Sequence, residues 1–485
     1  MPSCRARGRT DGSTPVTGTT TSPLPTPVTA TPARRRAALI GLSLGYIMVL
    51  LDTTVVNVAL PAIQHDLGAG VVALQWVTAG YTLTFAALLL TAGALTDRFG
   101  GRRVFLAGAG AFGGLSAVCA LAPDPATLVA LRALLGAAGA LLLPSSLAVI
   151  SGMFTDRALR ARALGSWAAI TGLALVAGPP VGGLLTQLFS WRAVFVVNVP
   201  IAAAAVAVVR RCTRPVAAPS PRELDPAGQL LAVLTLGTLT AGLTRAGDAG
   251  WADPWTAAGV VAAGAGAVAF VAVERRRERA GRSPMLPVTM FRDRTFSGAL
   301  FAGLVVNFGI AGALFLLSLF FQQARGWSSL TAGLAFLPMT LPTALNPVVT
   351  GRIVARIGPR CPAALGMVLI AAGAAVQAGA TGGSRAAVVV GLGALVLVGY
   401  GISFALPALV AGLMATVPAE RAGIASGALN AARQTGAVLG VAVLGGVLSA
   451  GPTAAAGTRN GMLITAALAL VAAGVVLAAV GRRPR

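Results

Sequence analysis

Apolar residues along this chain gather into windows of about 20, and short polar segments separate the windows. A helix of that length spans the hydrocarbon core of a bilayer. Because backbone groups in lipid must be satisfied within their own segment, the pattern predicts an all-α membrane protein with about 14 transmembrane helices. The predicted spans are 38–60, 74–95, 103–122, 127–150, 164–187, 193–210, 227–246, 255–274, 296–321, 330–349, 361–380, 386–416, 423–448 and 460–480.

The polar segments between these spans differ in charge. All 37 basic residues are arginine; about 30 lie in the tails and even-numbered loops, about 5 in the odd-numbered loops, and Arg132 and Arg433 inside spans. Cytoplasmic loops carry the excess of basic residues. The asymmetry therefore predicts a multi-pass protein of the plasma (cytoplasmic) membrane with both termini in the cytoplasm.

The first 33 residues are rich in Thr, Pro, Ser and Arg and have almost no large apolar side chains. Such a composition cannot form a core, so we expect residues 1–33 to be a disordered tail. No apolar stretch with a cleavage site follows its charges, which argues against a secretory signal.

The chain repeats itself once. The segments 93–102 and 351–360, GALTDRFGGR and GRIVARIGPR, align without gaps, and each joins two spans on the side predicted to be cytoplasmic. Two halves with matching loops suggest the parallel repeats of secondary transporters.

The spacing of the two copies predicts an insertion. The first copy follows the second span, but the second copy follows the tenth span rather than the eighth. Two spans, most simply 227–246 and 255–274, are therefore extra. The predicted division is a six-helix bundle in 34–212, a linker with two extra helices in 213–282, and a second six-helix bundle in 283–485.

One acid stands well inside a predicted span. Asp52 lies in the run LDTTVVNVALP, whereas the other 13 of the 14 acids fall in tails, loops or helix ends. A charge in hydrocarbon is costly, so an intramembrane acid is a functional-site hypothesis. The alternative is a polar residue packed against a neighbouring helix or reaching outward.

Arg132, in the fourth span, is the expected partner of this acid. Antiparallel spans place Arg132 and Asp52 within about 6 Å of each other in depth. A carboxylate balanced between burial and a permanent cation can exchange a proton if water reaches it from alternate sides. The alternative is a static ion pair that stabilises the bundle.

Six motifs in order along the chain carry a family resemblance. They are LDTTVVNVALP, LQWVTAGYTL, GALTDRFGGRR, LRALLGAAGA, GLALVAGPPVGGLL (followed by WRAVFVVNVP) and GIASGALNAARQTGAVLGVAVLGG. Together they resemble the major facilitator superfamily and, within it, the fourteen-span drug:proton antiporter family of multidrug efflux pumps. The resemblance implies the major-facilitator fold, with two six-helix bundles plus two inserted helices.

The resemblance implies a cytoplasmic gate in the loop after the second span. Its residues are Gly93, Asp97, Arg98, Gly100 and Arg102. The glycines allow a tight reversal, and Asp97 can accept hydrogen bonds from the arginines or from a helix N-terminus. The alternative is a solvated turn, and the second copy has Ala355 in the place of the acid.

The fifth span resembles the antiporter motif of the family. Its characteristic residues are Gly172, Gly178, Pro179, Pro180, Gly182 and Gly183. They predict a bent helix with one face bare of side chains, which can slide against the opposite half or simply pack closely.

Several polar residues are candidates for a substrate path, with Arg433 foremost. An arginine in mid-membrane must face a polar cavity or a partner, so it lines the path or clamps a backbone. The candidates are Asn57, Tyr81, Asn307, Asn430, Arg433 and Gln434.

Other functions find no support in the sequence. The net charge of +23 comes from arginines in short loops, so it orients the chain and does not indicate nucleic-acid binding. No His/Cys cluster offers a metal site, and no P-loop or HExxH motif is present. We therefore expect neither catalytic residues nor a metal or cofactor. We expect the proton gradient to be the energy source.

The favoured function is a proton-coupled exporter, an antiporter of lipophilic drugs or toxic small molecules that works by alternating access. With one membrane acid we expect neutral or monocationic substrates, about one proton per cycle, and a monomer. The alternative on the same fold is a dedicated exporter of one endogenous metabolite or self-made antibiotic. An uptake symporter and a non-transporting membrane sensor or scaffold are less favoured.

Overall fold

The computed structural model describes residues 31–154, 156–214, 225–282, 285–418 and 421–481. The predicted tail lies almost entirely outside these residues. The helices are α1 (Pro32–Leu67), α2 (Val71–Phe99), α3 (Gly101–Cys119), α4 (Pro125–Met153), α5 (Arg157–Leu188), α6 (Ala193–Val196), α7 (Asn198–Cys212), α8 (Pro226–Ala249), α9 (Pro254–Arg279), η1 (Val288–Arg292), α10 (Arg294–Leu319), η2 (Phe320–Ala324), α11 (Ser329–Leu334), α12 (Leu337–Leu345), α13 (Pro347–Ile357), α14 (Arg360–Gly379), α15 (Arg385–Met414), α16 (Ala422–Ala450) and α17 (Ala454–Ala479).

The prediction of an all-α membrane protein is confirmed. Twelve helices among the described residues are long and apolar enough to cross a membrane, and the bent run of α11 to α13 adds up to one more. The remaining predicted span, 103–122, corresponds to α3, a 19-residue helix that opens with Arg102 and Arg103. The number of fourteen spans therefore stays a prediction.

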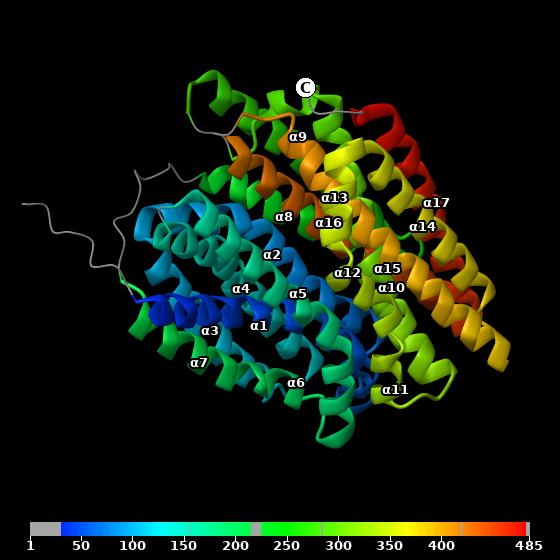
Figure 1. Ribbon diagram of the computed structural model, residues 1–485. Coiled ribbons are helices and arrows are strands. Elements are labelled where there is room, and N and C mark those ends of the chain that lie inside the picture. Colours follow the sequence, from blue (N-terminus) through cyan, green and yellow to red (C-terminus); the bar gives the residue numbers. More distant parts are fainter. Residues whose placement is uncertain (1–30, 155, 215–224, 283–284, 419–420, 482–485) are drawn as a thin grey trace, which may run out of the picture.

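The apolar core falls into two main clusters, one for each half of the chain. The first is built almost wholly from α1 to α7, and the second from α10 to α17. Figure 1 shows the blue and cyan helices of the first half beside the yellow and red helices of the second. Buried polar residues can therefore lie in two places, inside a half or between the halves.

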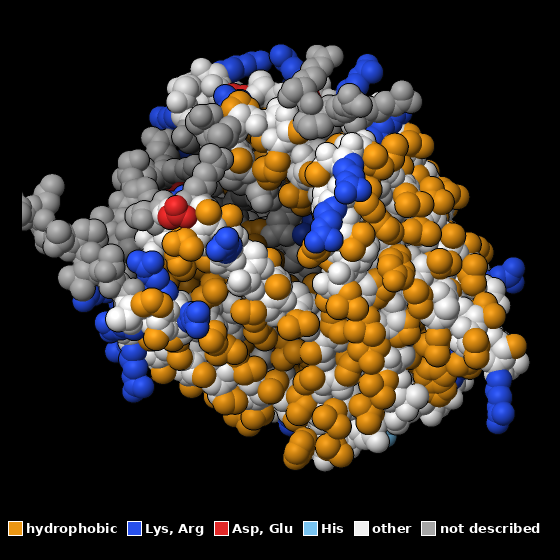
Figure 2. All heavy atoms as spheres, viewed as in Figure 1, with side chains coloured by type: hydrophobic (Ala, Val, Ile, Leu, Met, Phe, Trp, Pro, Cys, Tyr) orange, Lys and Arg blue, Asp and Glu red, His pale blue; other side chains and the backbone are white. Residues whose placement is uncertain are grey.

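The two ends of the bundle differ in charge. At one end Arg34, where α1 begins, donates to the carbonyl of Arg211 at the end of α7, and Thr295 of α10 donates to the carbonyl of Ala479 at the end of α17. We call this the arginine-rich end; the opposite, arginine-poor end carries Arg192, Arg245, Arg325, Arg385 and Arg459. On the face in Figure 2, blue side chains gather towards the upper left and orange ones dominate below.

Two of the predicted continuous spans are interrupted. The span 330–349 is a run of three helices, and α13 is bent by 47° from the segment before it. Prolines at the first turns of α12 and α13 explain the breaks, since proline lacks the N–H of a helical hydrogen bond. The span 193–210 is divided between α6 and α7.

Helices α8 and α9 form a hairpin outside the two cores. They cross where Gly242 meets Gly259, and α8 reaches both halves, with Gly247 against Gly446 of α16 and Gln229 donating to the carbonyl of Ala87 on α2 at 2.7 Å. The side chain of Arg245 clasps Asp253 at the turn, and these hydrogen bonds hold the pKa of Asp253 below its usual range. The outer helix α9 leaves most of its apolar surface exposed.

The arginine asymmetry predicts which end faces the cytoplasm. A green fluorescent protein fused after residue 485 is expected to fluoresce in bacterial cells, because this reporter folds only in the cytoplasm. A fusion after Gly382, between α14 and α15 at the arginine-poor end, is expected to be dark and, as an alkaline phosphatase fusion, active. The opposite pattern would reverse the assigned orientation.

Candidate functional site

Asp52 and Arg132 form an ion pair inside the first half. Nη1 of Arg132 donates to Oδ2 of Asp52, and each residue is only 1% exposed. Nε of Arg132 donates to the carbonyl of Val77 at 2.9 Å, and its guanidinium lies 4.4 Å from the ring centre of Tyr81 and 5.9 Å from that of Phe195. Carboxylate, carbonyl and aromatic faces together compensate a charge that lipid would exclude.

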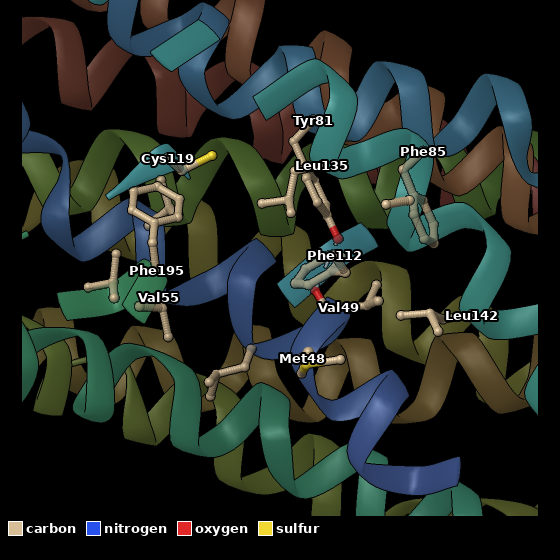
Figure 3. Packing of buried hydrophobic residues seen from close by; sticks show 14 of the residues in the cluster. Met48, Val49, Val55, Tyr81, Phe85, Phe112, Cys119, Leu135, Leu142 and Phe195 are labelled. Carbon is tan, nitrogen blue, oxygen red and sulfur yellow. Dashed lines mark hydrogen bonds between the residues drawn. The ribbon is translucent and has the colours of Figure 1, made fainter. Parts of the chain in front are cut away.

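Apolar side chains from several helices enclose this pair. Figure 3 shows Val49 and Val55 of α1, which flank the acid along the helix, with Phe112 of α3, Leu135 of α4 and Phe195 of α6 in the same cluster. The low dielectric of such a shell strengthens the attraction between the two charges and raises the cost of separating them.

The second carboxylate oxygen of Asp52 is unpartnered. Oδ1 is buried and has no hydrogen-bond partner among the described residues. Asp52 also lines neither of the two cavities between the halves, although its neighbours Thr53 and Thr54 do line one of them. In this conformation the carboxylate is therefore shut off from the central cavity, which differs from the expectation that water reaches it there.

Tyr81 also lies away from the place expected for it. It is fully buried, its hydroxyl donates to the carbonyl of Val49 at 3.4 Å, and its ring lies under the Arg132 guanidinium. It lines neither cavity. The residue proposed for the substrate path thus belongs to the surroundings of the ion pair.

Two adjacent cavities that share lining residues lie between the halves. The mouth cavity, about 680 Å³, is lined at the arginine-rich end by the last turns of α2, the second half of α4 and the first half of α16. The inner cavity, about 260 Å³, lies nearer the middle of α1, α2, α10 and α16. Tyr46, Asn430 and Arg433 line both, and Figure 2 shows a hollow between the halves.

Five of the six predicted substrate-path residues meet at the inner cavity. They are Asn57, Asn307, Asn430, Arg433 and Gln434. Nε of Arg433 donates to Asn307 Oδ1 at 3.3 Å, and the Asn307 amide donates to Gln434 Oε1 at 3.4 Å. A polar chain of side chains thus runs along the second-half wall of an otherwise largely apolar cavity.

The arginine-poor end is closed by contacts between the halves. Ser318 donates to the carbonyl of Asn57 at 2.6 Å, and Gln322 donates to the carbonyl of Val58 at 2.9 Å. Further towards this end, the amide of Gln323 donates to Gln64 Oε1 at 2.6 Å. The cavity system is thus open towards the arginine-rich end and sealed at the other end.

The small residues of α5 allow two close crossings at this seal. A Cβ on Gly178 would lie 1.8 Å from Thr54 Oγ1 of α1, and one on Gly182 would lie 2.7 Å from the Val55 carbonyl. On the other side of α5, a Cβ on Gly183 would lie 2.4 Å from the carbonyl of Ser329 in α11. Pro179 and Pro180 lie inside this helix, and Gly172 faces the inner cavity.

The predicted gate loop lies at the rim of the mouth cavity. Gly93 and Asp97 line that cavity, and Gly100 has a φ of 86°, a left-handed conformation suited to glycine. Arg102 donates to the carbonyl of Arg210 on α7 at 3.0 Å, and Arg98 lies over the ring of Phe99. The loop is thus placed where a gate would stand, and its role as a latch stays a prediction.

An acidic cluster on the α8–α9 hairpin escaped the sequence analysis. Glu274 is fully buried and accepts a hydrogen bond from the Leu286 N–H at 2.9 Å, and Arg277 lies 3.2 Å from Asp225. Asp225 also lines the mouth cavity. In the sequence, Asp225 precedes a proline, which marks a helix start, and Glu274 ends an apolar run. Neither signal predicts that Asp225 and Glu274 lie close together.

The fold and the paired charges agree with a comparison with protein families. The family model described as Major Facilitator Superfamily matches residues 42–441. The chain belongs to the major facilitator superfamily. It is accordingly a transporter and not an enzyme.

Relatives among characterised proteins share this membership. The chain is 36% identical over 412 residues to the multidrug resistance protein Stp of Mycobacterium tuberculosis (strain CDC 1551 / Oshkosh), covering 85% of this chain and 75% of Stp. It is 36% identical over 425 residues to the tetracenomycin C resistance and export protein of Streptomyces glaucescens, covering 87% and 77%. Relatives of this major facilitator protein thus act in resistance and export.

A solved structure has the same fold. A bacterial homolog of the human lysosomal transporter Spinster, in an inward-facing and unoccupied conformation, superposes with a TM-score of 0.65 at 20% identity over 93% of this chain and 97% of that one. At this identity the likeness concerns the fold alone.

The close crossing of α5 on α1 makes a stability prediction. Gly178→Ala is expected to destabilise the protein by about 1–3 kcal/mol, because the added methyl group overlaps Thr54. The measurement is the apparent melting temperature in detergent. The matched control is Gly172→Ala on the same helix, where a Cβ meets no atom within 4 Å; equal melting temperatures for the two variants would contradict the packing argument.

Proposed function

We propose that this major facilitator protein is a proton-coupled antiporter that exports lipophilic small molecules across the plasma membrane, works as a monomer and needs no cofactor. One observation carries the proposal. Asp52, well inside a membrane helix, is paired with a permanent cation behind the wall of a cavity that is open at only one end. Such an acid can couple proton binding to transport if its ion pair with Arg132 forms or breaks as cargo enters or leaves the cavity.

Helix α1 provides the mechanical link between the acid and the cavity. Its Asp52 faces the interior of the first half, whereas Thr53 and Asn57 of the same helix face the inner cavity. A displacement of α1 caused by cargo in the cavity therefore also displaces the carboxylate relative to Arg132. The glycine contacts of α5 let α1 move without dragging large side chains.

The transport cycle follows from this link. With the arginine-rich end assigned to the cytoplasm, the described conformation faces inward, its outer end is closed, and Asp52 is ionised and paired. Cargo enters the cavity, the halves rock, and the outer contacts open. A proton from outside then neutralises Asp52, releases it from Arg132 and favours return. Once the cavity faces inward again, the carboxyl gives this proton up to the cytoplasm and pairs with Arg132. Each inward proton supplies roughly 2.3 kcal/mol per 100 mV of membrane potential.

The direction of transport rests on the relatives. Stp is named as a multidrug resistance protein, and the Streptomyces glaucescens relative is named as a resistance and export protein for tetracenomycin C. A broad multidrug pump is therefore the first candidate. The second is a dedicated exporter of one endogenous compound, which is favoured by a relative named for a single antibiotic. A resistance panel of chemically unrelated compounds separates the two, since a dedicated exporter protects against one compound only.

Removing the acid is expected to uncouple the pump. Asp52→Asn should abolish proton-driven uptake of a fluorescent dye into inverted vesicles, because the amide of asparagine cannot take up and release a proton as the carboxyl group of Asp52 does. Since the variant leaves a buried cation unpaired, the double variant Asp52→Asn/Arg132→Gln is expected to regain stability but not coupling.

The matched control for this experiment is Asp124→Asn. Asp124 caps α4 through its hydrogen bond to the Thr127 N–H at 2.9 Å, and asparagine caps a helix equally well. This variant is expected to transport like the unaltered protein. Proton-driven transport at full rate by Asp52→Asn would refute the coupling role.

A cross-link across the closed end is expected to stop transport. In a background with the native cysteines replaced by serine, the double variant Gln64→Cys/Gln323→Cys places two thiols where two side chains are now hydrogen-bonded. A bifunctional methanethiosulfonate reagent that joins the two thiols should block efflux and a reductant should restore it, because the outer end must open in each cycle. The single variant Gln323→Cys is the control. Unimpaired transport by the cross-linked protein would contradict alternating access.

A further inference from the structure

The two arginines inside the membrane are compensated in different ways. Arg132 has the carboxylate of Asp52. Arg433 has a hydrogen bond to the neutral Asn307 at 3.3 Å and no ion pair among the described residues. It lies about 11 residues, roughly 16 Å, from the start of α16, so it is deep in the bundle. The positive charge of a guanidinium at that depth is costly unless a negative charge compensates it.

The charges on the cavity walls do not supply this compensation. Among the described residues, three charged side chains line the two cavities, and of these three only Arg433 lines the inner cavity. The two acids, Asp97 and Asp225, line only the mouth cavity, in the last turn of α2 and just before α8. The deep part of the cavity is therefore positively charged.

An aromatic wall faces the same space from the first half. The rings of Tyr46 and Trp167 are stacked with their centres 5.1 Å apart, and both residues line the mouth cavity. A guanidinium only donates, so the cavity offers the donors of Arg433 beside the flat apolar rings of Tyr46 and Trp167.

From these features we infer that the cargo is an aromatic compound with an acidic group, held with its carboxylate or ionised hydroxyl on Arg433 and its ring against Tyr46 and Trp167. The planar fork of a guanidinium binds a carboxylate with two parallel hydrogen bonds. The combined cavity volumes suit a ligand of drug size. This inference rests on the proposed function and names its substrate class.

This substrate class replaces the expectation of neutral or monocationic cargo. That expectation rested on the lack of further membrane acids, and the same lack leaves Arg433 without a counter-charge. Export of an anion in exchange for a proton moves two charges in the electrically favoured sense. Each contributes roughly 2.3 kcal/mol per 100 mV, so membrane potential drives both movements.

The test compares three probes with one ring system and different charges. They are anthracene-9-carboxylate, 9-methylanthracene and 9-(aminomethyl)anthracene, titrated at pH 7 into the purified full chain in detergent and followed by fluorescence anisotropy. The carboxylate is expected to bind at least about tenfold more tightly than the other two, as a charge-assisted hydrogen bond allows. Arg433→Gln is expected to remove this preference, and Arg433→Lys to restore part of it.

The control is Arg459→Gln, an exposed arginine at the start of α17, which is expected to bind all three probes unchanged. Equal affinity of the unaltered protein for the three probes, or an intact preference in a folded Arg433→Gln, would overturn the inference. If that variant does not fold, the comparison of probes on the unaltered protein and Arg433→Lys still decides.

A transport arm separates this inference from the proposed function. In proteoliposomes with an imposed proton gradient, gradient-driven movement of the neutral or cationic probe without that of the carboxylate would refute the acidic cargo and keep the exporter. Arg433-dependent binding of the carboxylate with no gradient-driven movement of any probe would keep the binding site and refute the proton-coupled function.

Discussion

A charge inside a lipid bilayer has to be compensated, and this constraint organises the molecule. Inside the first half, Arg132 is compensated by Asp52 and enclosed by apolar side chains. Between the halves, Arg433 is tolerated because it lines a polar strip of a cavity. One arginine is thus part of a sealed pair and the other faces a cavity, and α1 borders both environments.

The seal at the arginine-poor end relies on backbone groups. Ser318 and Gln322 both donate to main-chain carbonyls of α1, and α10 ends there in a π-helical turn, a distortion frequent at functional sites. Contacts of this kind depend little on the identity of the receiving side chains. Together with the glycine crossings of α5 and the apolar side chains of Val58, Phe315 and Leu319, each of which packs into the core of the opposite half, they make a tight interface.

The sequence predicted much of this arrangement, and the reasons for its failures are physical. Hydropathy predicted the membrane helices, and helical rise alone predicted that Asp52 and Arg132 have nearly the same depth. The seclusion of Asp52 from the cavity was not predictable, because α1 is apolar on nearly all sides and gives no rotational phase. The meeting of Glu274 with Asp225 depends on how the inserted hairpin packs, which no local pattern encodes.

The hairpin of α8 and α9 affects how lipophilic molecules can reach the space between the halves from the bilayer. Two seams run between the halves, one where α2 meets α16 and one where α5 meets α12. Helix α8 lies along the first seam, held by Gln229 on α2 and by Gly247 on α16. Helix α8 thus covers this seam against a compound that diffuses within the leaflet. The seam between α5 and α12 has no comparable cover in the described part of the chain.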